Sequence, residues 1–177
     1  MKEVQPQLEK LRSKFADAVE IGDTIYVTIS SDKLYDCCEY LKELGYDLLQ
    51  FLTAIDRLGG GTTPANPHLA SQGEMLEKTN TLACTCSQEK IDLRYYFYSY
   101  THKGKVVVKS SCDRKGGRVK SITGLYGTAN WHEREVYDLF GIIFEGHPDM
   151  RRLLLEEDFV GHPLLKDYTG EGFVKFP

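Results

Sequence analysis

Apolar residues recur every three or four positions in two stretches near the start of the chain. Leu8, Leu11 and Phe15 follow this spacing, which predicts a helix over about residues 6–16. A second apolar stripe occupies residues 34–44, after serine and aspartate residues that favour a helix start, and it ends at a glycine. Two amphipathic helices are therefore expected in this part of the chain.

Four segments have the patterns of β-strands. Thr24–Ile29 alternates between apolar and polar positions, and Asp47–Asp56 is nearly continuously apolar in its middle, which predicts a central strand. Ile91–Tyr100 and Lys105–Cys112 are separated by a short turn and predict a hairpin. With the helices, these segments predict an α+β fold, a mixed, roughly four-stranded sheet with packed helices.

Residues 57–82 interrupt these patterns. The stretch opens with Gly59-Gly60-Gly61 and has no clear periodicity, which predicts an irregular surface excursion. A glycine-rich phosphate loop needs a following Gly-Lys-Ser/Thr at the start of a helix, and none is present. Phosphate binding is therefore not expected here.

The segment Asn130–Gly141 predicts a short helix. Asn130 can cap its start, Glu133 can then reach back to the free amides of the first turn, and Gly141 can end it. Arg134 and Asp138 are four residues apart and are expected to form an ion pair along the helix. Its polar face is either a solvated surface or a docking surface, and periodicity alone does not decide between them.

The chain beyond this helix is expected to be extended. Gly146-His147-Pro148 is echoed fifteen residues later by Gly161-His162-Pro163, and each proline biases the preceding histidine toward an extended backbone. Residues 158–177 lack core-forming periodicity and predict an arm that needs a surface to lie against. We therefore expect an α+β domain over residues 1–129, with residues 130–177 forming the helix and a docking arm of the same domain.

Composition narrows the classes of function. The chain has 177 residues, 41% hydrophobic and 27% charged, with a formal net charge of −4. This acidity argues against nucleic-acid binding by bulk charge, and no apolar run approaches the roughly 20 residues of a membrane span. Its five cysteines show no paired C-x-x-C spacing, so reduced thiols are expected. The N-terminus has no signal-peptide pattern, which favours a cytoplasmic location.

Two alternative functions come from other parts of the sequence. The predicted hairpin carries aromatic residues beside basic ones, as nucleic-acid modules do, although a packed sheet or a protein interface explains them more simply. His132-Glu133 begins like a zinc-protease motif, but Val136 stands where the second histidine ligand belongs. A small stand-alone metal enzyme and a nucleic-acid module thus remain as alternatives.

The sequence from residue 130 to 168 resembles the 30-kDa (C or J type) subunit of respiratory complex I, the NADH-quinone oxidoreductase. The resemblance is carried by Glu133-Arg134-Glu135, Asp138-Leu139-Phe140-Gly141, His147-Pro148, Arg151-Arg152-Leu153-Leu154 and Gly161-His162-Pro163-Leu164. The preceding residues 119–129 also fit the family. Residues 1–56 and 91–112 agree with it in layout.

The resemblance implies a peripheral subunit of an ion-translocating oxidoreductase, with no catalytic residue, cofactor or metal of its own. Iron–sulfur clusters, and any flavin, would belong to partner subunits. The implied partners are the 49-kDa quinone-site subunit and the subunit with the terminal iron–sulfur cluster, on the cytoplasmic face of a cell or thylakoid membrane. Equivalent subunits occur in membrane-bound nickel–iron hydrogenases and F420-dependent dehydrogenases, so the electron donor stays open.

We hypothesise that the charged residues of this signature hold the interface with those partners or the local network that shapes it. They are Glu133, Arg134, Glu135, Asp138, His147, Arg151, Arg152, His162 and Lys166.

Overall fold

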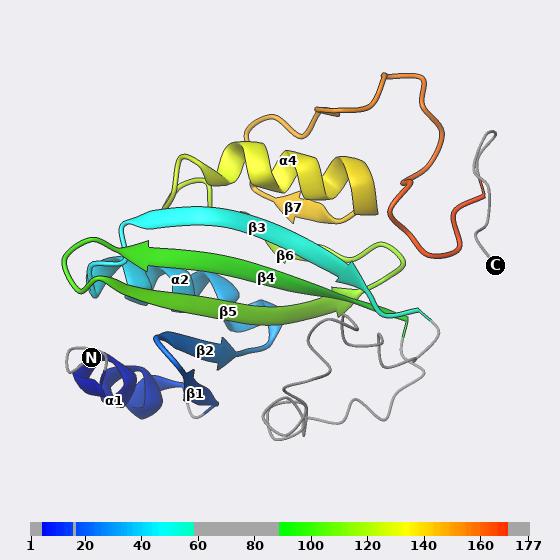
Figure 1. Ribbon diagram of the computed structural model, residues 1–177. Helices are drawn as coiled ribbons and strands as arrows, with labels where there is room; N and C mark the ends of the chain where they lie inside the picture. The colour runs from blue at the N-terminus through cyan, green and yellow to red at the C-terminus, as the bar shows by residue number, and fades with distance from the viewer. Residues whose placement is uncertain (1–4, 16, 59–88, 170–177) are drawn as a thin grey trace.

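A computed structural model describes residues 5–15, 17–58 and 89–169, with the side chains of residues 5–7 excepted. A mixed sheet with the strand order β1-β2-β5-β4-β3 forms its centre (Figure 1). The strands are β1 (Ala18–Ile21), β2 (Thr24–Thr28), β3 (Leu48–Asp56), β4 (Lys90–Ser99) and β5 (Gly104–Asp113). β2 and β5 run parallel, and the other neighbouring strands are antiparallel. The predicted α+β class is confirmed.

The helices and a second small sheet complete the fold. The helices are α1 (Gln5–Lys14), α2 (Leu34–Glu43), preceded by the short 3-10 helix η1 (Ser31–Lys33), and α4 (Ala129–Phe140). Strands β6 (Arg118–Lys120) and β7 (Ile143–Glu145) pair in parallel on either side of α4 in the sequence. Helix α2 lies behind the large sheet in Figure 1, and α4 lies along its β3 edge.

The sheet differs from the prediction in two ways. It has five strands rather than about four, because Ala18–Ile21 pairs with β2 as an additional edge strand. β3 is also an edge strand, so its predicted central position is wrong. Its run of apolar residues arises because both sides of the strand make apolar contacts. Leu52 and Ala54 are buried on one side, and Phe51 on the opposite side stacks on Tyr96 of β4.

The core lies on one side of the sheet. Leu93, Tyr95 and Phe97 point alternately inward from β4 and are fully buried. They belong to the same buried cluster as Leu41 of α2 and Val136 of α4. The helices therefore cover a single face of the sheet, and the positions between these residues on β4 remain half-exposed.

Two other expectations concern segments that lie largely or partly outside the described residues. Of the predicted excursion over residues 57–82, only residues 57 and 58 are described, and Cys84 and Cys86 also lie outside the described ranges. Cys37, Cys38 and Cys112 are buried free thiols.

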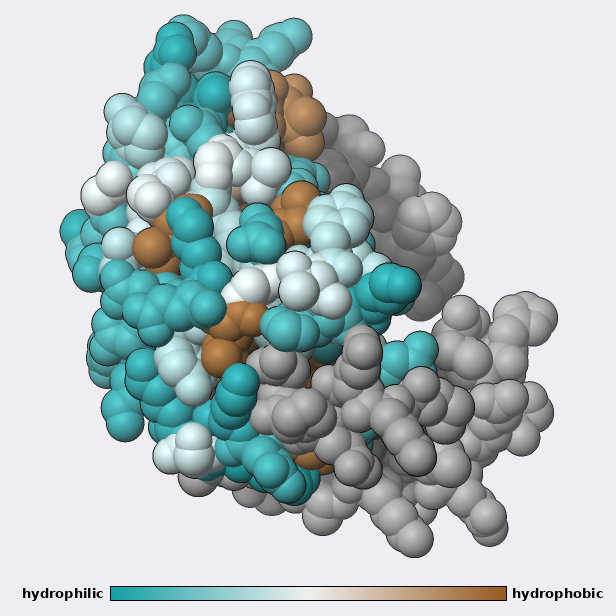
Figure 2. Space-filling view, turned by 90° about the vertical axis from the view of Figure 1, so that its left-hand side faces the viewer, coloured by the Kyte–Doolittle hydropathy of each residue, from teal (hydrophilic) through white to brown (hydrophobic). Residues whose placement is uncertain are grey.

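The side of the molecule that carries the β4–β5 turn is largely hydrophilic, with small separate apolar patches (Figure 2).

Candidate functional site

Helix α4 is the element on which the signature residues are arranged. Thr128 occupies the cap position without a side-chain cap bond, so the predicted Asn130 cap is wrong. Gly141 ends the helix with φ +77°, in the left-handed region that favours glycine, and its N–H donates to the Tyr137 carbonyl. The chain that follows β7 runs past α4 without forming a helix or strand, and from this point on we use the name arm for its residues 146–169.

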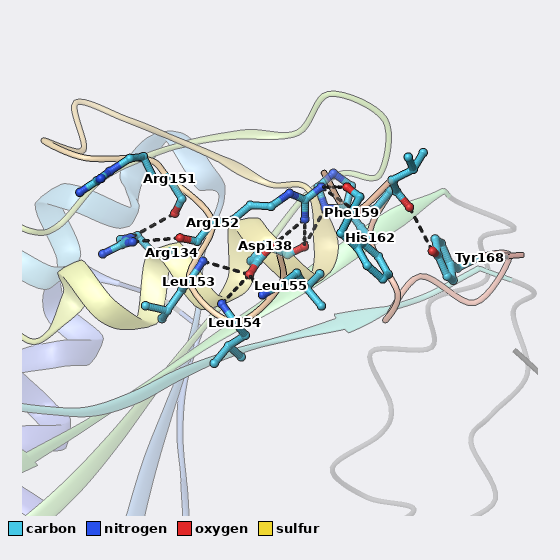
Figure 3. Close-up of polar contacts among 12 residues, drawn as sticks. Arg134, Asp138, Arg151, Arg152, Leu153, Leu154, Leu155, Phe159, His162 and Tyr168 are labelled. Carbon is cyan, nitrogen blue, oxygen red and sulfur yellow. Dashed lines mark hydrogen bonds and ion pairs between the residues drawn. The ribbon is translucent and has the colours of Figure 1, made fainter. Parts of the chain in front are cut away.

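Asp138 is the main attachment point for the arm. Its side chain is fully buried, and its Oδ2 accepts hydrogen bonds from the backbone amides of Leu153, Leu154 and Leu155 at 2.8–3.0 Å. Its Oδ1 accepts a hydrogen bond from the Arg152 guanidinium at 2.7 Å (Figure 3). Burial alone would raise the pKa of Asp138, but these donors together hold the pKa below its ordinary value.

Arg134 binds the arm rather than Asp138, so the predicted ion pair along the helix is wrong. Its guanidinium donates to the backbone carbonyls of Arg151 and Arg152 at 3.1 and 3.0 Å. It also lies over the ring of Trp131, one turn earlier on α4. The two residues of the expected pair thus bind the arm separately. Asp138 accepts hydrogen bonds from backbone amides of the arm, and Arg134 donates to backbone carbonyls of the arm.

Arg152 connects the two ends of a loop within the arm. Besides its ion pair with Asp138, it donates to the carbonyls of Phe159 and Gly161 at 3.0 and 3.1 Å. Its guanidinium also lies over the ring of Phe159. One side chain therefore fixes residues 152–161 to the helix (Figure 3).

The two Gly-His-Pro copies bind the two ends of α4. His147 Nδ1 accepts a hydrogen bond from the Asp149 amide, so its Nε2 donates to the carbonyl of Asn130 in the first turn, at 3.1 Å. His162 Nδ1 donates to the carbonyl of Asp138 in the last turn, at 2.9 Å. The repeat in the sequence thus corresponds to two matching attachments, one at each end of the helix.

Glu133 faces the core instead of the arm or the first turn. It is fully buried and accepts hydrogen bonds from Ser121 Oγ at 2.6 Å and from the Ile122 amide at 2.8 Å, so the predicted bond back to the free amides is wrong. Burial raises the pKa of Glu133 to about 7, although the two hydrogen bonds act in the opposite direction. The carboxyl joins α4 to the loop that follows β6.

The remaining signature residues make weaker or no side-chain contacts. Glu135 is half-buried and forms no hydrogen bond or ion pair within the described residues. Arg151 forms an exposed ion pair with Asp149 at 2.7 Å. Lys166 is exposed, and its Nζ donates to the carbonyl of Leu58.

A second attachment holds the far end of the arm to the end of β3. Arg114 and Asp56 form a buried ion pair at 3.0 Å, and Arg114 also binds both carboxylate oxygens of Asp167 in the arm. Asp56 accepts further bonds from the amides of Lys166 and Leu58. Burial would raise the pKa of Asp56, but Arg114 and these amides hold it below its ordinary value. Sequence reasoning missed this cluster, because its ionised side chains come from three distant places, with Arg114 58 residues from Asp56 and 53 residues from Asp167.

The polar groups that hold the arm leave apolar side chains pointing outward. Leu154, Val160 and Leu164 are 62%, 84% and 51% exposed, and Trp131 on α4 is 60% exposed. The described residues contain no group of three or more His, Cys, Asp or Glu that could hold a metal ion. In the same ranges, no helix combines the length and hydropathy of a membrane span. Fold and site define an α+β protein whose charged signature fixes an extended arm with an exposed apolar surface.

Comparison with known protein families identifies this class. The family "Respiratory-chain NADH dehydrogenase, 30 Kd subunit" matches residues 27–174. The chain is also 32% identical to the C-type subunit of NADH-quinone oxidoreductase from Geobacter metallireducens, over 97% of this chain and 93% of that protein. The same subunit from Geotalea uraniireducens is 33% identical over 92% and 86% of the two chains. The chain belongs to the 30-kDa subunit family of complex I, as the signature predicted.

Solved structures support the same assignment. A trypsin-resistant fragment (1-134) of Nqo5 superposes with a TM-score of 0.60 at 25% identity, covering 83% of this chain and 98% of the fragment. A chain of an archaeal membrane-bound sulfane sulfur reductase superposes with a TM-score of 0.65 at 21% identity, over 89% of this chain and 79% of its own. The second likeness concerns the fold alone.

Proposed function

We propose that this chain is a non-redox subunit in the peripheral arm of a proton-translocating NAD(P)H- or ferredoxin-quinone oxidoreductase, on the cytoplasmic side of the membrane. Its role is that of a scaffold, which binds the quinone-site subunit and the subunit that carries the terminal iron–sulfur cluster. Membership of the complex I family and the names of the curated relatives support the quinone oxidoreductase over a hydrogenase or an F420-dependent dehydrogenase.

The observation that carries the scaffold role is the way the arm is held. Four donors converge on Asp138, and Arg134 binds two arm carbonyls, so the backbone is fixed before any partner binds. A pre-ordered binding segment loses less conformational entropy on association. Exposed aliphatic and tryptophan side chains that are surrounded by charged residues are also typical of protein interfaces. The signature residues thus act mainly by shaping the surface that the partners contact.

A substitution on the apolar surface of the arm tests this role. Val160 is the most exposed large apolar residue of the arm and makes no side-chain polar contact, so Val160→Asp leaves the network around Asp138 intact. Purification through a tag on the full chain should then recover at least about tenfold less of the quinone-site subunit, because burying an unpaired carboxylate costs several kcal/mol. Ser30→Asp, at an exposed position at the start of η1, is the matched control and should recover normal amounts.

Equal recovery of partner subunits with both variants would contradict the scaffold role. The alternative of a stand-alone metal enzyme makes a different prediction, because the purified chain would then retain stoichiometric zinc or iron. Metal analysis of the same preparations distinguishes the two functions.

A further inference from the structure

The outer face of the large sheet has no helix over it among the described residues. Strands β3, β4 and β5 lie in front of α2 in Figure 1. Because the buried side chains of β4 belong to the same core cluster as Leu41 of α2, the side chains that alternate with them face away from that helix. The register aligns Tyr96 of β4 with Phe51 on one side and with Val107 on the other, and Val107 with Tyr26 of β2. These residues form a row across the sheet.

The middle of this outer face is aromatic and apolar. Phe51 is 42% exposed and stacks on Tyr96 with ring centroids 4.0 Å apart. At the other edge, Val19 and Ile21 of β1 are 50% and 40% exposed and lie beside Tyr26 and Thr24 in the register. Three of the large apolar side chains that the structure exposes therefore lie on this one surface, which the arm does not include.

The charge of the outer face is opposite to that of the whole chain. Its basic side chains are Lys90, Arg94, Lys105 and Lys109. Asp92 forms an ion pair with Arg57 at 2.6 Å, and Asp113 is opposite Lys90 in the register. Within the described ranges, Arg94, Lys105 and Lys109 form no ion pair, in a chain whose net charge is −4. Asp92 also attracts Lys109, but it is already paired with Arg57.

We propose that the outer face of the sheet is a second docking surface, which binds an acidic surface on another protein subunit of the complex. An aromatic centre with a rim of Arg and Lys fits the composition of protein interfaces, and the excess positive charge requires carboxylates opposite it. The inference rests on membership of a multi-subunit complex and does not depend on the arm.

Other occupants fit this surface less well. A second copy of the chain would bring Arg94, Lys105 and Lys109 against the same residues, since a two-fold interface places one patch against itself. Once the acidic residues on this face are taken into account, three basic side chains remain unpaired, fewer than the about 6–10 phosphate contacts of a nucleic-acid interface or the about 4–8 basic residues of a membrane-binding cluster. Three unpaired basic side chains are sufficient to pair with a few carboxylates on a protein partner.

Zero-length cross-linking of the intact complex tests the proposal. A carbodiimide joins a lysine amine only to a carboxylate in contact with it, so Lys105, which is exposed in the isolated chain, should become linked to an Asp or Glu of another subunit. Lys33, exposed in η1 and outside the sheet, is the matched control and should not be linked. The double variant Arg94→Glu, Lys105→Glu should lower recovery of the linked subunit by about tenfold or more, because like charges then face each other. Lys33→Glu should leave recovery unchanged.

Several results would overturn the proposal. Lys105 would be acetylated by an amine reagent equally fast in the intact complex and in the isolated chain, or its cross-links would join only residues of this chain or a second copy of it. Salt-sensitive RNA binding that the double variant abolishes would identify a different occupant. Because Val160→Asp acts on the arm, loss of recovery in that variant with normal Lys105 cross-links would separate the two surfaces.

Discussion

Two buried carboxyl groups on helix α4 behave in opposite ways because of their surroundings. Asp138 receives three amides and a guanidinium, which favour its ionised form. Glu133 receives one hydroxyl and one amide and has no ion pair among the described residues, so burial is the larger effect. The first group holds the arm by its charge, and the second is a source of pH dependence within the fold.

The raised pKa of Glu133 predicts that stability decreases with pH. In the unfolded chain the group titrates near ~4.3, and in the folded chain at about 7, so the folded state binds more protons between these values. The free energy of unfolding should therefore fall as the pH rises through this window, by up to about 3 kcal/mol, and then stay level. Glu133→Gln should remove this decrease, as measured by denaturant unfolding between pH 5 and 8.5.

The comparison between the two proteins isolates the contribution of Glu133. Asp56 and Asp138, whose pKa values are lowered, are present in both proteins and lose their stabilising effect only as the pH falls below the usual carboxylate range. Parallel stability curves for the wild type and Glu133→Gln would show that this carboxyl is ionised in the folded protein at pH 6.

At the scale of secondary structure, the end of α4 and the arm depend on each other. A Cβ atom on Gly141 would lie 2.6 Å from the ring of His162, whose Nδ1 donates to the last turn of the helix. Glycine is thus required here both for the left-handed cap and for the close approach of the histidine. The short helix is stabilised from outside by His147, His162 and Arg152 of the arm, because a helix of 12 residues has little intrinsic stability.

Gly141→Ala and Gly146→Ala form a matched pair that tests this dependence. Both glycines have positive φ, +77° and +84°, so each substitution costs about 1–2 kcal/mol of backbone strain. Only at Gly141 would the new Cβ displace His162, since nothing lies within 4 Å of it at Gly146. We expect Gly141→Ala to lower the free energy of unfolding by at least about 1 kcal/mol more. Hydrogen exchange of the amides of residues 153–155 should also increase in that variant alone.

Equal losses of stability in the two alanine variants would mean that the histidine contact contributes nothing beyond the backbone cap.

At the scale of the whole molecule, the arm is fastened at two distant places. One is α4, through Asp138 and Arg134, and the other is the end of β3, through the Asp56–Arg114 pair and Asp167. Between them the exposed apolar residues of the arm are presented on a fixed backbone. The described part of the arm, residues 146–169, is therefore held to the rest of the chain at both of these places.

Asp138→Ala should release the first attachment. It leaves Arg152 half-buried without its carboxylate and three amides without an acceptor, a loss on the order of 3–5 kcal/mol. Limited trypsin digestion of this variant should cut after Arg151 and Arg152 much faster than in the wild type, and assembly with partner subunits should decrease. Asp149→Ala removes the exposed pair with Arg151 and should cost only about 0–1 kcal/mol, with unchanged assembly.

Normal trypsin resistance and normal assembly of Asp138→Ala would contradict the idea that this carboxylate fixes the arm for its partners.

Local patterns in the sequence were sufficient for most elements and for the family. Helices α2 and α4 and strands β2 to β5 follow from periodicity and turn residues, which act between near neighbours. The signature over residues 130–168 identified the 30-kDa subunit family. β1 was missed because a four-residue strand has too few positions to show alternation, and β3 was misplaced because the same apolar run suits a central or an edge strand.

The partners of the charged residues were decided only by the tertiary structure. Arg134 and Asp138 are four positions apart in the sequence, but in the folded chain the arm lies against both of them. Each therefore binds backbone groups of the arm instead of the other residue. Backbone amides and carbonyls are present at every residue, so no sequence pattern marks which of them a side chain will bind. The Asp56–Arg114–Asp167 cluster is the clearest case. It forms only after β3 and β5 have both paired with β4 and the arm has passed the end of β3.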